Sequence, residues 1–312
     1  MRNKGFLRSV TVSFGPKARL SRNADHRRSN MKTMAVATLC LLLTLKVAAQ
    51  PSQRFAQRAN AGLAATSQCY STFTFGSGQT LFNFCVTGNG NVTQLTSPAG
   101  YEHIGLGLIG EGYGLCDYAA QARYFDYADF GDSGNWGSPT VNQPNGANTF
   151  PFSIVRSTAD GLFTLTQAFT RNTAERIVVV KTTIKNNSPI TKQLVLVRFA
   201  DIDANNGHFG DYQNWFDQDS DSAWGYNSLS LVALNPVPVY GVKLITGSVL
   251  VPHQAGTFDV AAKGFAGPDP CFPSLSENDN TPILEDGGVW LAHFVALKKG
   301  TAATVNVEYR RF

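Results

Sequence analysis

The segment between Arg198 and Lys243 holds the residues best suited to bind a cation. It contains no Lys or Arg but has six aspartates: Asp201, Asp203, Asp211, Asp217, Asp219 and Asp221. Crowded carboxylates repel one another, and a hard cation such as calcium, with about six to eight oxygen ligands, relieves that repulsion. The segment therefore predicts a calcium site.

Two short runs in this segment place side-chain oxygens at alternate positions, as calcium loops do. The predicted ligands are Asp201, Asp203 and Asn205 in the first run, and Asp217, Asp219 and Asp221 in the second. Neither run is a complete EF-hand, because the twelfth residues are Tyr212 and Ser228 instead of Glu. The alternative is a set of solvated turns that cap strand ends.

Aromatic residues gather in the same glycine- and aspartate-rich connections. Sugars need flat aromatic faces for their C–H surfaces, together with acceptors for their hydroxyl groups. The predicted carbohydrate-binding residues are Trp136, Trp215, Trp224, Tyr124 and Tyr127. The alternative is that these rings cover the faces of a β-sandwich.

Hydrolysis of a glycosidic bond needs two carboxylates about 5 to 9 Å apart. The sequence offers too many acids to choose a pair, among them Glu111, Asp126, Asp129 and Asp132. The first acid or base groups to consider are Glu102, His103 and His208. A single histidine in a β protein is more often a packing or turn residue.

The sequence lacks the motifs that are typical of several classes of function. There is no Gly-x-Ser-x-Gly, no phosphate-binding glycine loop, no His-Glu-x-x-His and no stripe of basic and aromatic residues. The sequence therefore gives no support to a serine hydrolase, a nucleotide-binding protein, a zinc protease or a nucleic-acid partner.

The basic character of the chain comes from its first 49 residues. The whole chain has a formal net charge of +4, but residues 1–49 hold ten Lys/Arg and one acid. Residues 50–312 have 16 Lys/Arg and 21 Asp/Glu, a net charge of −5. Removal of the leader therefore leaves an acidic protein.

The leader has the pattern of a signal peptide. Residues 31–49 begin with Met31-Lys32, continue with an apolar run to Leu45, and end in Val47-Ala48-Ala49, which predicts cleavage after Ala49. The run is shorter than the roughly 20 residues of a membrane span, so no stable span is expected after cleavage. Residues 1–30 are predicted to be an unstructured leader or a mis-assigned start, and residues 50–68 a flexible arm. The protein is predicted to be secreted or periplasmic.

Four cysteines remain after cleavage: Cys69, Cys85, Cys116 and Cys271. An even number in an exported chain predicts two disulfides, with three possible pairings. Cys69 and Cys85 flank a predicted hairpin, which favours their pairing and leaves Cys116 with Cys271.

Alternating runs rich in Val, Ile, Thr and Phe predict a single all-β domain over residues 69–312, a large antiparallel β-sandwich of about a dozen strands. The predicted strands are 69–75, 80–86, 92–96, 152–157, 162–170, 177–185, 193–200, 228–234, 240–246, 257–262, 289–297 and 303–309. Residues 97–148 have no clear period.

Residues 80–227 resemble a known family. A strand that ends in Lys185-Asn186-Asn187-Ser188, and a partner strand that runs through Arg198-Phe199-Ala200-Asp201-Ile202-Asp203, are similar to the β-supersandwich of the galactose-mutarotase-like superfamily. The Gly88-Asn89-Gly90 turn and the glycine-rich stretch to Asp117 are similar to the N-terminal domain of bacterial glucoamylase-type enzymes. In those enzymes a catalytic α-barrel follows this domain, whereas this chain ends at Phe312. No mutarotase catalytic His/Glu pattern is found.

The sequence thus favours a secreted, non-catalytic protein that recognises a saccharide, with calcium support, through loops 101–136 and 201–227 at one edge of the sandwich. One alternative is a glycan-active hydrolase, lyase or epimerase that uses loop carboxylates. Another is a structural cell-surface domain stabilised by calcium.

Overall fold

The computed structural model describes residues 68–204, 212–217, 222–227, 241–248, 250–260, 263–273 and 287–312. All of them belong to one compact unit, Ala56–Phe312. The predicted leader, the signal peptide and the strand at 228–234 lie outside the described residues.

The described residues form three antiparallel sheets. The first strands are β1 (Cys69–Phe75), β2 (Phe82–Thr87), β3 (Val92–Thr96), β4 (Glu111–Asp117), β5 (Ala122–Asp126), β6 (Thr140–Asn142), β7 (Phe152–Ser157) and β8 (Phe163–Asn172). The others are β9 (Ile177–Asn186), β10 (Lys192–Asp201), β11 (Tyr212–Asp217), β12 (Ser222–Asn227), β13 (Gly241–Thr246), β14 (His253–Asp259), β15 (Gly287–Leu297) and β16 (Ala302–Arg311). Two 3-10 turns, Gly78–Thr80 and Ala128–Phe130, are the described helical elements. The all-β class and the sandwich are confirmed.

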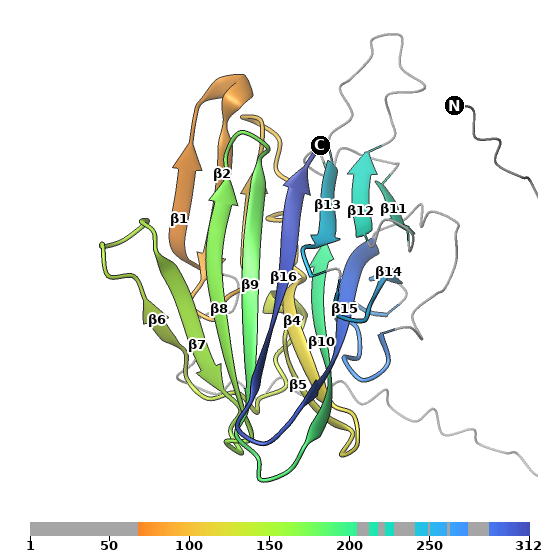
Figure 1. The fold of residues 1–312 in the computed structure, drawn as a ribbon. Helices are drawn as coiled ribbons and strands as arrows, with labels where there is room; N and C mark the ends of the chain where they lie inside the picture. Colours follow the sequence, from red (N-terminus) through yellow and green to blue (C-terminus); the bar gives the residue numbers. More distant parts are fainter. Residues whose placement is uncertain are drawn as a thin grey trace, which may run out of the picture. The chain divides into compact units, whose positions relative to one another are not determined.

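The sheets have three, five and eight strands, in the orders β1-β2-β3, β14-β15-β10-β4-β5 and β11-β12-β13-β16-β9-β8-β7-β6. Figure 1 shows β7, β8, β9 and β16 side by side, with β4 and β10 behind them. Where one face of a strand is buried, its residues alternate between buried and partly exposed, as they do along β7.

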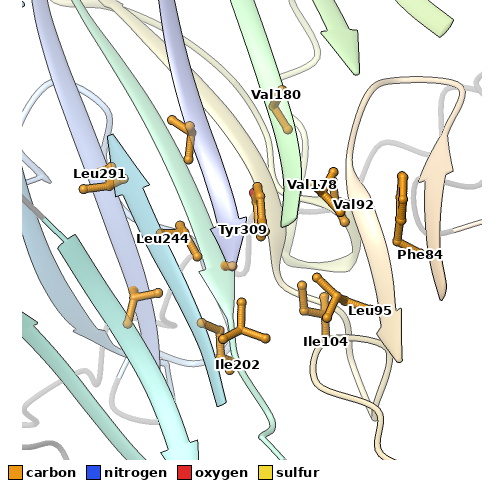
Figure 2. Close-up of a cluster of buried hydrophobic side chains, with 14 of the residues drawn as sticks. Phe84, Val92, Leu95, Ile104, Val178, Val180, Ile202, Leu244, Leu291 and Tyr309 are labelled. Carbon is orange, nitrogen blue, oxygen red and sulfur yellow. The ribbon is translucent and has the colours of Figure 1, made fainter. Parts of the chain in front are cut away.

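The main core is shared by all three sheets. Phe84 of β2, Val180 of β9 and Leu291 of β15 belong to one buried cluster, and Figure 2 shows them among the side chains of this cluster. A second cluster packs Leu115 of β4 against Leu165 of β8, between the five- and eight-stranded sheets. These clusters remove the inner faces of the sheets from water.

The five-stranded sheet is also covered on its other face. A third cluster packs Val197 of β10 and Trp290 of β15 against Tyr127 and Cys271, which lie in connecting segments. Every residue of β4 is therefore buried. A strand buried on both faces has no alternation of polar and apolar residues. β4 also contains Gly112 and Gly114, and glycine is disfavoured in strands, so the sequence did not predict it.

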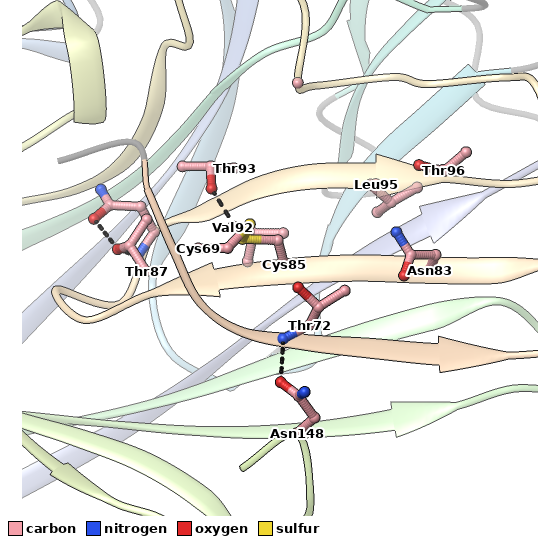
Figure 3. Close-up of a disulfide and its surroundings, with 12 residues drawn as sticks. Cys69, Thr72, Asn83, Cys85, Thr87, Val92, Thr93, Leu95, Thr96 and Asn148 are labelled. Atoms are coloured by element: carbon pink, nitrogen blue, oxygen red, sulfur yellow. Dashed lines mark hydrogen bonds between the residues drawn. A yellow bond between two sulfur atoms is a disulfide. The ribbon is translucent and has the colours of Figure 1, made fainter. Parts of the chain in front are cut away.

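The two disulfides pair as predicted, Cys69 with Cys85 and Cys116 with Cys271. The first joins β1 to its neighbour β2, and Figure 3 shows it beside Thr93 of β3. The second joins β4 to Cys271, which lies 155 residues further along the chain. Two disulfides fit a protein from an oxidising compartment.

Candidate functional site

An ion pair lies at the centre of the sandwich, where β4, β10 and β16 contribute one side chain each. Arg198 pairs with Oε1 of Glu111 at 2.5 Å, and its Nε donates to the hydroxyl of Tyr309 at 2.6 Å. Its other groups donate to Gln167 Oε1 at 2.7 Å and to the Gly90 carbonyl at 3.2 Å. Burial raises the pKa of Glu111 to about 7, although the charge of Arg198 and the Tyr309 hydroxyl favour the ionised carboxylate.

A second ion pair lies nearby, on β5 and β7. Nη1 of Arg156 is 2.6 Å from Oδ2 of Asp126, and it also donates to the hydroxyl of Tyr113 at 2.8 Å. Asp132 stands 3.6 Å from the other guanidinium nitrogen. Burial raises the pKa of Asp126 to about 6. Of the acids proposed for catalysis, Asp126 and Asp132 are thus brought together, but both face an arginine.

The turn between β2 and β3 joins the two ion pairs. Asn89 donates to Asp126 at 2.8 Å, and its carbonyl accepts from Tyr113 at 2.9 Å and Gln167 at 3.3 Å. Gly90 has a φ of +98°, and a Cβ there would lie 2.1 Å from Gln167 Nε2, so only glycine fits. This network therefore fixes the hairpin against both large sheets. It is a buried structural unit, because each ion is paired inside the protein.

Glu102 and His103 also have structural roles. Oε1 of Glu102 accepts backbone N–H groups from Leu95 at 2.7 Å, Ile104 at 3.1 Å and Gly105 at 2.8 Å. His103 is fully buried, its Nε2 hydrogen-bonds to the Ser97 carbonyl at 3.0 Å, and burial lowers its pKa. Neither side chain is available to a substrate in this arrangement. The third candidate, His208, lies outside the described residues.

Three of the predicted carbohydrate-binding rings are in the core. Trp136 is 5% exposed, Tyr124 2% and Tyr127 1%. The Trp136 ring packs edge-on against Tyr113 and Tyr124, with centroids 5.5 and 6.0 Å apart, and Tyr124 donates to Asp160 at 2.6 Å. These rings have no face open to a saccharide. The structure therefore assigns them the alternative role, that of packing the sandwich.

The predicted calcium ligands are only partly within the described residues. Asp201 is 4% exposed at the end of β10, and Asp203 is half-buried. Asn205, Asp219 and Asp221, with the side chain of Asp217, lie outside the described residues. Within the described part, no group of three or more His, Cys, Asp or Glu side chains is placed to hold a metal ion. The calcium site stays a prediction.

Within the described residues, the two loops expected to meet at one edge come together at their bases. The backbone N–H of Asp201 donates to the carbonyl of Gly110 at 2.6 Å. Trp136, however, pairs with Thr158 beyond β7, whereas Trp224 belongs to β12, near the opposite edge of the eight-stranded sheet. The predicted aromatics therefore do not form one cluster.

The outer face of the eight-stranded sheet carries the remaining candidates. In an antiparallel sheet, residues directly opposite each other share a face. Trp215 of β11, Trp224 of β12, Lys243 of β13 and Arg310 of β16 are consecutive partners across four strands. Their neighbours in the chain, such as Leu244, are in the core. Trp224, Lys243 and Arg310, which we call the outer row, therefore lie on the face that points away from the core.

Two members of the outer row interact directly. The ammonium group of Lys243 lies 4.7 Å from the centroid of the Trp224 ring, within the range of a cation–π interaction. Both side chains are half-buried, so each keeps some contact with water. Trp224 was predicted from its type and its loop-like surroundings, whereas Lys243 and Arg310 were missed. Lys243 and Arg310 alternate with core residues along their strands, and this pattern could have indicated that they lie on the outer face.

The described residues include no helix with the length and apolarity that a bilayer crossing requires. No family model matches the sequence. No curated protein matches it either.

Solved structures that the chain is similar to include a bacterial glucoamylase complexed with acarbose and a protein assigned as an aldose 1-epimerase from Escherichia coli K12. The glucoamylase match has 9% identity and a TM-score of 0.49, and covers 78% of this chain and 32% of that one. The epimerase match has 11% identity and a TM-score of 0.43, and covers 78% of this chain and 99% of that one. The chain thus spans about a third of the glucoamylase. The fold loosely resembles glucoamylase and galactose-mutarotase-like proteins, as the sequence predicted.

Proposed function

We propose that this protein is exported and recognises carbohydrate, without chemical conversion, through the outer row of the eight-stranded sheet. The observation that carries the proposal is the position of Trp224. Among the predicted aromatics whose side chains the structure describes, it is the one that is not buried. Its strand partners are Trp215 and Lys243. An indole surface with polar neighbours is the combination that sugar rings require.

The proposal that the sugar is bound but not converted is supported by the surroundings of the two acidic side chains whose pKa values are raised. Glu111 and Asp126 are fully buried, and each is paired with an arginine. A glycosidase needs one carboxyl group to deliver a proton and another to attack or activate water at the sugar. These two side chains reach no sugar from the core. Release of new reducing ends from any bound glycan would contradict this part of the proposal.

Replacing Trp224 with alanine is expected to weaken glycan binding at least tenfold in Kd, or about 1.4 kcal/mol, because the stacking surface is lost. Residues 50–312 are first screened on a glycan array, and a hit is then titrated by calorimetry. Tyr118→Ala is the control, because Tyr118 is an aromatic residue that is 53% exposed after β4. Equal binding by the wild type and Trp224→Ala would place the sugar elsewhere.

We also propose that calcium binds the aspartates of residues 201–221 and supports the end of β10. Calcium that binds only the native state stabilises it, by about 2.7 kcal/mol at a hundredfold excess over Kd. Millimolar calcium is therefore expected to raise the Tm, and Asp203→Asn to reduce the increase. The measurement is thermal unfolding in calcium and in EDTA, with magnesium as the control. A Tm that is the same in calcium and EDTA removes the proposed ion.

A further inference from the structure

Two cations stand directly opposite each other in the outer row. Lys243 of β13 is the strand partner of Arg310 of β16. Like charges at directly opposite positions destabilise an antiparallel pair. The sheet therefore keeps an unfavourable pair on its outer face, and the surrounding side chains show how the two charges are accommodated.

Each cation has a partner that leaves it partly open to water. Lys243 lies over the Trp224 ring, which carries no net charge to neutralise it. Arg310 has Glu308 at 3.4 Å and Glu175 at 3.9 Å, and 42% of its side chain is exposed. Exposed ion pairs of this length are weak and exchange readily with a competing anion. Both cations can therefore turn towards a ligand without leaving a buried charge unpaired.

The positive charge extends beyond the outer row. Lys181 and Lys185 are exposed on β9, the next strand of the sheet, and Lys181 is opposite Asn306 of β16. Among the described side chains of this face, these two lysines, Lys243 and Arg310 make four cations, and Glu308 and Glu175 are the two acids that pair with Arg310. The described part of this face is thus more basic than residues 50–312 as a whole, which carry 16 Lys/Arg and 21 Asp/Glu. The concentration of cations on one face calls for an anionic ligand.

An indole beside two cations suits an acidic sugar better than a neutral one. The ring supports the C–H face of a pyranose, while the ammonium and guanidinium groups meet a carboxylate or sulfate on the same ring or the next. Single-stranded nucleic acid also combines stacking with negative charge. Residues 50–312, however, carry 16 Lys/Arg against 21 Asp/Glu, and the sequence lacks the basic-aromatic stripe of a nucleic-acid-binding protein. We therefore take the saccharide as the ligand and nucleic acid as the alternative to be tested.

We propose that the Trp224–Lys243–Arg310 row binds an acidic saccharide, with the sugar ring on the indole and its carboxylate or sulfate between the two cations. This inference rests on the proposed function, because it names the class of saccharide for the same face.

The test uses matched probes that differ in charge. The probes are oligogalacturonate and its methyl ester, a sulfated heparin tetrasaccharide, neutral cello-oligosaccharide and oligothymidylate. We expect at least one acidic probe to bind, and its affinity to decrease as the salt concentration is raised from 50 to 300 mM. If oligogalacturonate is the ligand, its methyl ester should bind at least tenfold more weakly. Lys243→Gln and Arg310→Gln should each weaken binding at least tenfold.

Lys299→Gln is the matched control, because it removes one exposed positive charge from the turn between β15 and β16. It should bind as the wild type does, and the Tm of all three variants should stay close to the wild-type value. Neutral glycans that bind as well as acidic ones, with dependence on Trp224, would overturn the acidic class but keep the proposed function. Tighter binding of oligothymidylate overturns the saccharide class, and the absence of binding to every glycan defeats both proposals.

Discussion

Arg198→Met is expected to lower the free energy of unfolding by about 3 to 5 kcal/mol, since it leaves one partner of a buried ion pair behind. Arg198 is 3% exposed, and it contacts Glu111, Tyr309, Gln167 and the Gly90 carbonyl. Methionine fills a similar volume but donates no hydrogen bond. The substitution therefore removes the interactions with the Glu111 carboxylate, the Tyr309 hydroxyl group and the turn between β2 and β3 at the same time. Urea unfolding, followed by circular dichroism, measures it.

The same substitution at a surface ion pair is the control. Arg123 pairs with Asp269 at 2.8 Å, but the two side chains are 35% and 41% exposed. Exposed pairs contribute about 0 to 1 kcal/mol, so Arg123→Met should have a small effect. Tyr309→Phe removes only the hydroxyl group of the network and should cost about 1 to 2 kcal/mol. If Arg198→Met and Arg123→Met had equal effects, the buried network would not be a main source of stability.

The pH dependence gives this prediction a second readout. Burial already raises the pKa of Glu111 to about 7 in the folded protein, above its ordinary value of 4.5. A carboxyl group with a raised folded pKa contributes most to stability at low pH, and this contribution is lost as the pH rises through the folded pKa. Without Arg198 the folded pKa of Glu111 rises further. The stability difference between Arg198→Met and the wild type should therefore widen above about pH 7.

Most of the strands that could be predicted from the sequence have one face exposed to water. β7, β8, β9 and β16 alternate along most of their length, and the sequence placed each of them within a few residues. β10 is buried from Leu194 to Asp201, and its run of apolar and β-branched residues predicted it instead. β4 was missed because it is buried on both faces, and its Gly-Tyr-Gly-Leu-Cys run has no period of two. β11 and β12 were missed because their acidic and aromatic residues suggested a loop.

The site was harder to predict than the fold, because residue type does not determine exposure. Trp136 and Trp224 both follow glycine- and aspartate-rich stretches, yet only Trp136 has Tyr113 and Tyr124 packed against it. Arg198 did leave a signal. It is a charged residue in the run Leu194–Ala200, which is otherwise apolar, and such a residue requires a buried partner. Its partner Glu111 lies 87 positions earlier in the chain, and only the pairing of β4 with β10 brings the two together.

The two disulfides are expected to differ in their contribution to stability. Cross-linking removes conformations from the unfolded chain, and the effect grows with the length of the closed loop. Cys116 and Cys271 are 155 residues apart, and Cys69 and Cys85 are 16 apart. The loop-closure relation gives about 5 kcal/mol for the long loop and about 3 kcal/mol for the short one. The Cys116→Ala/Cys271→Ala double variant should therefore be the less stable of the two.

The long-range disulfide also fastens part of the core. Cys116 is fully buried in β4, and Cys271 belongs to the cluster that covers the outer face of the five-stranded sheet, together with Tyr127 and Phe199. Its loss should let residues 263–273 open and expose that cluster, which amide hydrogen exchange detects as faster exchange in β4. Cys69→Ala/Cys85→Ala is the matched control, since it too removes two sulfurs, but from neighbouring strands β1 and β2. If this control were destabilised as much as the long-loop variant, loop closure would not be the origin of the effect.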